Sequence, residues 1–279
     1  MKALSLLLAA CLAAGTAFAQ DKEPVNAGPY VPSPDSVVAD MLKIADVGPT
    51  DFVIDLGSGN GKIVLTAAKV FGARGFGVEI QDKLVAQSNE AANQQGVADR
   101  VKFIKQDLFK TDISQATVLT MYLLPNTVNM LKDKLLAELK PGTRIISHDY
   151  PLAGWIPEKY VQMDLEEKVS ISGVTTTLIY LYMVPAKVSG SWTARVPATL
   201  SKEPVRVDLK QQLTRISGSA RIDGKEVALE DPKLRGDRIS FRIPGRKAEF
   251  NGQVKGSSIE GLAEVGGIKS PWTASLGQK

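Results

Sequence analysis

The sequence has very little cysteine and histidine, the residues that most often bind zinc and that serve as reactive thiol and as base. It contains one cysteine, Cys11, and one histidine, His148, among 279 residues. Zinc sites built from Cys and His are therefore excluded, and we expect no metal site. A Ser-His-Asp triad would have to use His148. If an N-terminal segment that includes Cys11 is removed, the mature chain has no thiol and forms no disulfide, so its fold depends on core burial alone.

Long hydrophobic runs are missing beyond the first residues, and a mean hydropathy of −0.03 excludes several membrane spans. Residues 1–19 have the layout of a signal peptide. Lys2 precedes an apolar run, and Ala17-Phe18-Ala19 places cleavage before Gln20. An uncleaved anchor in the inner membrane, or lipoprotein-type cleavage before Cys11, stays open. In each case we expect a periplasmic or secreted protein, or one anchored to the outer face of that membrane.

Charge is spread unevenly along a chain whose formal net charge is +4. Residues 185–279 carry 17 Lys/Arg against 10 Asp/Glu, whereas the balance of residues 20–184 is acidic. A basic C-terminal part suits contact with an anionic surface or an acidic partner. A basic surface without any particular ligand explains the same counts. We expect no nucleic acid partner.

The next segments indicate an α/β domain. Residues 20–34 are rich in proline and polar residues and are expected to form an arm. A helix is predicted over residues 35–45, with Ser33 or Asp35 as its cap. From residue 51, short apolar strands alternate with helices, which indicates crossover units and a largely parallel sheet. Strands are expected at 51–56, 75–80, 101–105, 116–123 and 143–147, and helices at 62–71, 83–95 and 127–139.

This alternation ends in a different pattern. Two long strands, 159–172 and 174–184, are predicted with a hairpin turn at Ser172-Gly173. A parallel sheet that ends in an antiparallel hairpin is what a Rossmann-like, seven-stranded methyltransferase sheet needs. We therefore assign residues 35–184 to an α/β domain of that class.

The last part of the chain has no helical pattern. Residues 185–279 contain short β-rich runs separated by turn residues at spacings of about 8–12 residues. They predict a small all-β domain, an antiparallel β-barrel or sandwich of six to eight strands. Trp192 and Trp272 stand near its two ends and are expected to pack over one core.

The most informative stretch runs from Asp55 to Gly61. An apolar strand ends in Asp55 and leads into a helix through Gly57, Ser58, Gly59 and Gly61. Glycines let the backbone turn tightly and approach a ligand. A dinucleotide-binding site has the spacing G-x-G-x-x-G, which places the N-terminus of a helix against the pyrophosphate. Here the spacing is G-x-G-x-G after a carboxylate, which better suits S-adenosylmethionine (SAM), a cofactor with an ammonium group and a sulfonium.

Two further acidic residues follow at the ends of the next strands. Glu79, before Ile80, is placed to accept hydrogen bonds from both ribose hydroxyls. Asp107 is placed to accept from the adenine amino group, and Leu108 to line the adenine face. Three carboxylates at successive strand ends are stronger evidence for SAM than the glycine loop alone. A nucleotide-type fold without a SAM site remains the alternative.

At these positions the chain resembles class I SAM-dependent methyltransferases. It more closely resembles the ATP synthase c-subunit lysine methyltransferase family and its bacterial relatives, over about residues 29–184. This resemblance includes three further segments. They are Pro29-Tyr30-Val31-Pro32, Tyr122-Leu123-Leu124-Pro125 and Ser147-His148-Asp149-Tyr150.

The resemblance implies methyl transfer from SAM to an accessible lysine of a protein substrate. It implies that Tyr30 and Pro32 cover the cofactor and that Tyr122 and Pro125 line the channel for the lysine. An apparent export signal and an added β-domain depart from the mitochondrial members, so the family's substrate is not carried over.

Two residues at the end of the fifth predicted strand are candidates for a general base. His148 or Asp149 is placed to remove a proton, although His148 equally suits a structural role. Tyr122 has core packing as its alternative role. Two other functions stay open, a non-catalytic binding protein whose β-domain binds a partner or envelope polymer, and a methyltransferase acting on a small molecule.

Overall fold

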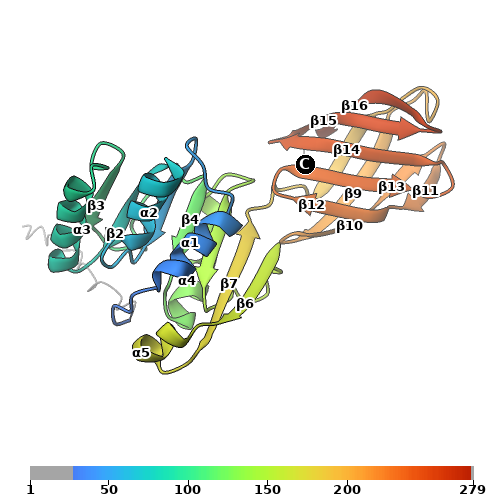
Figure 1. Cartoon of the computed structure of the whole chain (residues 1–279). Coiled ribbons are helices and arrows are strands. Elements are labelled where there is room, and N and C mark those ends of the chain that lie inside the picture. Colours follow the sequence, from blue (N-terminus) through green and yellow to red (C-terminus); the bar gives the residue numbers. More distant parts are fainter. Residues whose placement is uncertain (1–27, 278–279) are drawn as a thin grey trace, which may run out of the picture.

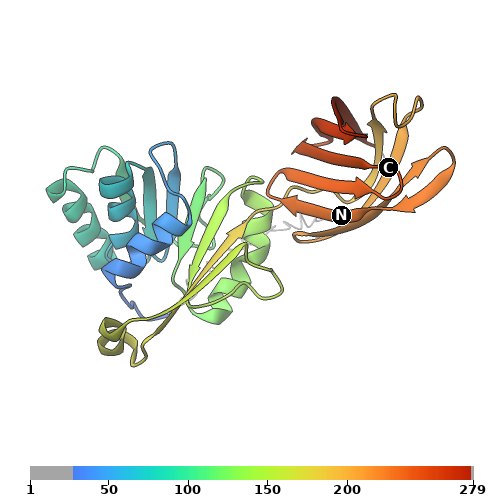
Figure 2. The same ribbon diagram turned by 45° about the vertical axis from the view of Figure 1, so that its right-hand side comes forward.

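A computed structural model of the chain describes residues 28–277. Two sheets form two lobes that lie end to end (Figures 1 and 2). The predicted signal peptide, residues 1–19, and the first part of the predicted arm lie outside the described residues. Between residues 28 and 277, no helix is both long and apolar enough to cross a membrane.

The N-terminal lobe contains a mixed seven-stranded sheet in the order β3-β2-β1-β4-β5-β7-β6. Only β7 runs antiparallel to its neighbours, β5 and β6. The predicted methyltransferase sheet with a terminal antiparallel hairpin is thus confirmed. Its strands are β1 (Phe52–Leu56), β2 (Arg74–Glu79), β3 (Val101–Lys105), β4 (Val118–Met121), β5 (Arg144–His148), β6 (Lys159–Asp164) and β7 (Thr176–Met183).

Helices cover both faces of this sheet, because its strands are apolar on both sides. The helices are α1 (Asp35–Ile44), α2 (Lys62–Phe71), α3 (Asp82–Gln94) and α4 (Pro125–Glu138). Helices α1 and α2 share one core with Val53, Val118 and Ile146. Helix α4 packs on the other face, against Leu119 and Ile145. The carboxyl ends of β1 to β5 therefore meet at one edge, between the two helical layers.

Two local predictions in this lobe are wrong. Helix α1 begins after Pro34 without a side-chain cap, because the hydroxyl of Ser33 is bonded to His148 instead. The strand expected over 159–172 stops at Asp164. A single-turn 3-10 helix, η1 (Glu166–Lys168), and a short helix, α5 (Val169–Ser172), follow it. The last residue of η1 is a buried lysine, and its burial removes the segment from the hairpin.

The C-terminal lobe is a nearly closed antiparallel sheet of nine strands, one more than the predicted upper limit. Its order is β11-β10-β9-β8-β16-β15-β14-β13-β12, so the two edge strands are neighbours in the chain. Trp192 and Trp272 are both buried in its single core, and Trp272 packs edge-on against Phe241 and Phe250. Its strands are β8 (Gly190–Arg195), β9 (Val205–Gln212), β10 (Arg215–Ile222), β11 (Lys225–Ala228), β12 (Glu230–Arg235), β13 (Arg238–Ile243), β14 (Ala248–Lys255), β15 (Ser258–Val265) and β16 (Ile268–Leu276).

The turn between β12 and β13 touches the N-terminal lobe. Gly236 has φ +59°, and a Cβ there would lie 2.8 Å from Met183 Sδ and 3.0 Å from the Gly142 backbone. Beside it, Ala186 N–H donates to the Gly236 carbonyl, at 2.8 Å. Arg235 pairs with Glu158 of the N-terminal lobe, at 2.9 Å. Leu213, in the turn between β9 and β10, also packs against the core of the N-terminal lobe, so the junction of the lobes includes both turns.

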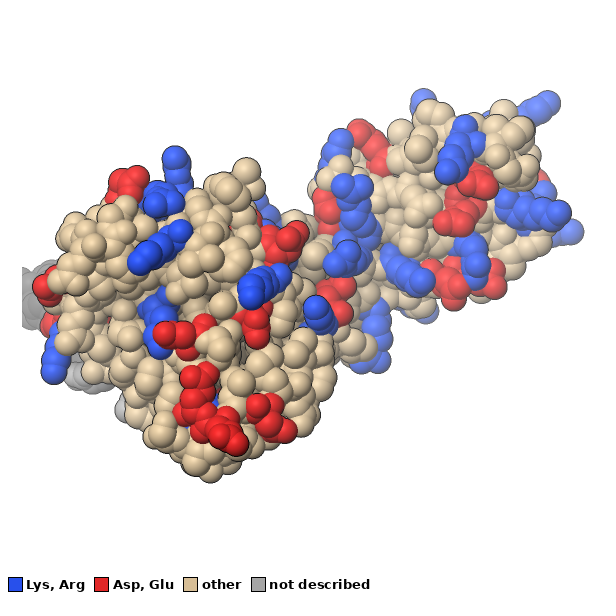
Figure 3. All heavy atoms as spheres, in the orientation of Figure 1, with Lys and Arg blue, Asp and Glu red and all other residues tan. Residues whose placement is uncertain are grey.

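Charged side chains alternate in sign on the C-terminal lobe (Figure 3). Arg242 pairs with Glu230 and Asp231, and Lys255 pairs with Glu260. The excess of basic residues is thus dispersed on the face shown and does not form one continuous patch.

Candidate cofactor and acceptor site

A cavity of about 530 Å³ opens at the carboxyl edge of the seven-stranded sheet. Its volume lies in the range of small-molecule sites. The glycine loop, the ends of β1 to β4 and the arm before α1 all contribute to its wall. The predicted site residues that line it are Tyr30, Pro32, Asp55, Gly57, Ser58, Glu79, Ile80, Asp107, Leu108 and Tyr122.

The loop after β1 is shaped by backbone hydrogen bonds to β2 and by glycines with positive φ. The N–H groups of Gly57 and Ser58 both donate to the Val78 carbonyl, at 2.9 and 2.8 Å. Gly57 and Gly59 have φ +77° and +54°, a region that other residues rarely adopt. A Cβ on Gly59 would lie 2.3 Å from the Tyr30 ring. Gly57 therefore brings its backbone to the cavity wall, while Gly59 leaves room for Tyr30 to lie over the loop.

Gly59 and Gly61 do not line the cavity themselves. Gly59 supports the Tyr30 ring, and its N–H donates to Glu79. Gly61 has φ +79° and precedes α2, and a Cβ there would lie 2.6 Å from the Phe103 ring. Their contribution is to place the loop and the start of α2.

Asp55 is a buried carboxyl group at the end of β1. It is 2% exposed, and its Oδ1 accepts a hydrogen bond from Thr120, at 2.7 Å. Burial raises the pKa of Asp55 to about 7, and the negative charge of Glu79 adds to that rise while the Thr120 bond opposes it. A cationic ligand in the cavity would relieve this unfavourable burial.

Glu79 and Asp107 complete the predicted set of carboxylates. Glu79 Oε1 accepts from the N–H groups of Ile80 and Gln81, at 2.8 and 3.0 Å, and Oε2 accepts from Gly59, at 3.0 Å. Each carboxylate oxygen has two lone-pair sites, so Oε2 keeps capacity for a ligand hydroxyl. Asp107 Oδ1 accepts from Phe109 N–H, at 2.8 Å. The backbone thus fixes both carboxylates at the cavity wall.

The described part of the arm covers the cavity. Tyr30 lies over the glycine loop, against Gly59, and burial raises the pKa of its hydroxyl. Lys62 holds the arm down, because its Nζ donates to the Ser33 carbonyl at 2.9 Å and pairs with Asp35 at 2.6 Å. Sequence reasoning missed Lys62, although its position directly after Gly61, at the first turn of α2, was an available signal.

Tyr122 forms the wall of the cavity beyond the end of β4, and its ring stacks on His148 with centroids 3.9 Å apart. His148 is fully buried, and its Nδ1 lies 3.0 Å from Ser33 Oγ. Burial lowers the pKa of His148 to about 4, so the imidazole is neutral at pH 7. It lies behind Tyr122, outside the cavity lining.

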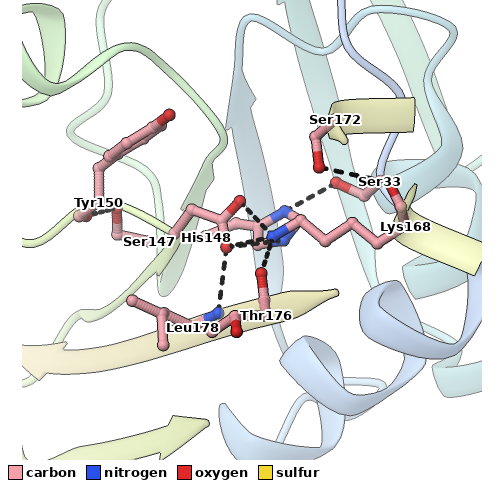
Figure 4. A network of polar contacts seen from close by, with 9 residues as sticks. Ser33, Ser147, His148, Tyr150, Lys168, Ser172, Thr176 and Leu178 are labelled. Atoms are coloured by element: carbon pink, nitrogen blue, oxygen red, sulfur yellow. Dashed lines mark hydrogen bonds and ion pairs between the residues drawn. The ribbon is translucent and has the colours of Figure 1, made fainter. Parts of the chain in front are cut away.

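Asp149 and Pro125 also lie outside the cavity lining. Pro125 is the first residue of α4, where its fixed φ suits the helix start. Asp149 is paired with the buried Lys168, whose Nζ is 2.7 Å from both carboxylate oxygens (Figure 4). This pairing helps to hold the pKa of Asp149 below its ordinary value against the effect of burial. Lys168 was missed because only the fold brings it to Asp149.

Comparison with known proteins agrees with this geometry. The model of the ANTKMT methyltransferase domain matches residues 55–159. A protein-lysine N-methyltransferase of Saccharolobus islandicus is 43% identical over 157 residues, which cover 56% of this chain and 93% of that protein. An ATP synthase c-subunit lysine N-methyltransferase of Xenopus laevis is 34% identical, and the match covers 47% of this chain and 57% of that protein.

A solved structure extends the comparison to a bound ligand. An RNA methyltransferase from Salinibacter ruber, in complex with S-adenosyl-L-homocysteine, is 43% identical with a TM-score of 0.51. The match covers 57% of this chain and 96% of that one. This chain is a SAM-dependent methyltransferase, and its cavity, lined by three carboxylates and the Gly57 backbone, suits a cationic cofactor.

Proposed function

We propose that this chain, which belongs to the ANTKMT-type family of SAM-dependent methyltransferases, transfers a methyl group to the side-chain amine of a lysine in another protein. The identity with the Saccharolobus enzyme supports the lysine acceptor, because the match spans nearly all of a protein named for that activity. One structural observation carries the proposal. Three carboxylates from successive strand ends line a cavity whose wall also includes an aromatic ring, Tyr122.

The chain's own residues would bind and orient the cofactor. Asp55 and Glu79 present negative charge and acceptor atoms at the cavity wall, and Leu108 presents an apolar face. Tyr30 covers the glycine loop and limits access of water from that side. When bound, SAM supplies an electrophilic methyl group attached to a sulfonium.

The acceptor amine must reach the cavity as a neutral group. Tyr122 offers an aromatic wall that stabilises positive charge on nitrogen and shapes the entrance. Burial and the neighbouring Asp149 raise the pKa of Tyr122 above its ordinary value, so its hydroxyl stays protonated. A general base drawn from His148 or Asp149 is disfavoured, because neither side chain reaches the cavity lining. Desolvation of the lysine lowers its own pKa and supplies the neutral amine.

The decisive experiment is methyl transfer from labelled SAM into an unfractionated protein extract, with mass spectrometry to identify the modified residue. We expect label on lysine. We expect Asp55→Asn to lower the rate at least about tenfold, in keeping with loss of a buried charge contact. Asp99→Asn is the matched control, since it removes an exposed carboxylate that does not line the cavity.

A parallel reaction with total RNA tests the other acceptor class named among the similar structures. Label in RNA and none in protein would overturn the lysine proposal while leaving SAM binding intact. Transfer into neither, despite measurable binding of SAM, would favour a small-molecule acceptor or a non-catalytic role.

We also propose that the enzyme acts outside the cytoplasm, as residues 1–19 suggest. Fractionation of producing cells should recover it in the periplasmic fraction with Gln20 as its first residue. A cytoplasmic protein that retains Met1 would contradict this proposal.

We further propose that the C-terminal lobe contacts an anionic surface through its net charge, 17 Lys/Arg against 10 Asp/Glu in residues 185–279, and not through one continuous basic patch. Vesicles containing phosphatidylglycerol should retain the protein at low salt and release it at high salt, because such attraction is screened. Equal retention on vesicles of neutral phosphatidylcholine would contradict an electrostatic contact.

A further inference from the structure

One lysine of the N-terminal lobe is buried without any part in the cavity. Lys168 ends the single turn η1, between β6 and β7, and is 2% exposed. A buried ammonium group is unfavourable unless it is paired and hydrogen-bonded. The structure meets that requirement in full, so the position of this side chain is strictly determined.

All three donors of the Lys168 ammonium group are used. Its Nζ donates to Oδ1 and Oδ2 of Asp149, each at 2.7 Å, and to the Thr176 carbonyl, at 2.5 Å (Figure 4). Asp149 also accepts from Leu178 N–H, at 3.0 Å, and has φ +61°. Its backbone is therefore held in a conformation that few non-glycine residues adopt. Together these contacts leave the Asp149 carboxylate very little freedom to move.

The fixed carboxylate lies against the residue that supports the cavity wall. Asp149 Oδ1 is 3.5 Å from His148 Nε2, and Ser33 Oγ of the arm lies 3.0 Å from His148 Nδ1. The His148 ring in turn packs against the Tyr122 ring, with centroids 3.9 Å apart and planes tilted by 32°. Tyr122 is thus backed by an imidazole that is held between the Asp149 carboxylate and the arm.

We propose that Lys168 is a positioning residue that fixes the Tyr122 ring at the cavity wall by immobilising Asp149. Lys168 neither lines the cavity nor contacts Tyr122, so its influence passes through Asp149 and then His148. The role in catalysis rests on the proposed lysine methyltransferase function, whereas the positioning of Tyr122 does not.

His148 provides a direct measurement, since it is the only histidine in the chain. Its imidazole signals can be assigned without ambiguity in a nuclear magnetic resonance spectrum, and we expect the ring current of Tyr122, 3.9 Å away, to displace them. In Lys168→Met we expect this displacement to be lost to the same extent as in a Tyr122→Leu variant. An unchanged His148 spectrum in Lys168→Met would overturn the proposal, whatever reaction the enzyme catalyses.

A double-mutant cycle gives the catalytic test. We expect Lys168→Met to lower the rate of transfer into extract protein about tenfold at saturating SAM, with affinity for SAM within about twofold of wild type. In a Tyr122→Leu background the same substitution should have almost no further effect, because the ring that His148 supports is already gone. Independent, multiplying effects would show that Lys168 acts only on the stability of the hairpin.

Lys168→Met leaves a carboxylate buried without its partner, and unfolding of that variant is the foreseeable failure. The variant Lys168→Met/Asp149→Asn removes both charges and avoids this problem. We expect it to fold and to show the same loss of the His148 displacement. A folded double variant with a wild-type His148 spectrum would equally overturn the proposal.

Discussion

The buried carboxyl group of Asp55 makes cofactor binding depend on pH in a direction that can be calculated. Its pKa of about 7 in the free protein means that the neutral acid predominates below pH 7. The ammonium and sulfonium groups of SAM favour the ionised form. Binding therefore releases a proton, and affinity rises as the pH is raised through this range.

The size of the effect follows from the ionised fraction. With a pKa of about 7, about 3% of Asp55 is ionised at pH 5.5 and about 50% at pH 7.0. If only the ionised form binds well, the apparent affinity for SAM increases about 15-fold between these values. The range stops at pH 7.0 because an α-amino group such as that of SAM begins to titrate near pH 7.7 to 8.0.

Isothermal titration calorimetry measures both the affinity for SAM and the number of protons released on binding. At pH 6.0, titrations in two buffers of different ionisation heat should reveal release of about 0.9 proton per SAM bound. Asp55→Asn should bind more weakly and with no dependence on pH over the same range. Wild-type affinity that is constant from pH 5.5 to 7.0, without proton release, would refute the reasoning.

Three further outcomes follow from the structure. Gly59→Ala should weaken SAM binding at least about tenfold, because the new Cβ displaces the Tyr30 ring. Gly96 has a similar φ and open space around it, so Gly96→Ala should leave the affinity for SAM, measured by calorimetry, unchanged. Burial lowers the pKa of His148 to about 4, so the stability that the neutral imidazole provides is present above pH 6.5 and is lost as the pH falls toward 4. In urea unfolding, the free energy of unfolding of the wild type should fall by about 2 kcal/mol between pH 7 and 4.5, relative to His148→Asn. Trp272→Ala should destabilise the nine-stranded sheet by about 3–5 kcal/mol in thermal unfolding, with SAM affinity unchanged. A wild-type affinity in Gly59→Ala, an equal pH response in His148→Asn, or weakened SAM binding in Trp272→Ala would contradict the respective argument.

Much of the sheet and its cofactor edge could be predicted because short-range signals define them. Asp55 and Glu79 each end a strand, and parallel strands bring their carboxyl ends to one edge. The glycine spacing after Asp55 then identifies that edge as a ligand site. These inferences need only the order of elements along the chain.

The acceptor side was less predictable because its contacts join distant segments. Ser33 was expected to cap α1, yet it is bonded to His148, 115 residues away. The run ending at Ser172 alternates like a strand, but the ion pair of Lys168 with Asp149 draws the chain into a short turn. No local pattern distinguishes a lysine that will be buried from the many that stay in solvent.

The junction between the lobes has a geometric consequence of its own. At Gly236 the two lobes approach so closely that a hydrogen atom fits where a methyl group does not. A larger residue there would require Met183 or the Gly142 backbone to shift, so this position limits how closely the two lobes can pack. Leu213 and the Arg235–Glu158 pair join the lobes as well, so the direction in which the basic lobe faces depends on a small group of contacts far from the methyl-transfer site.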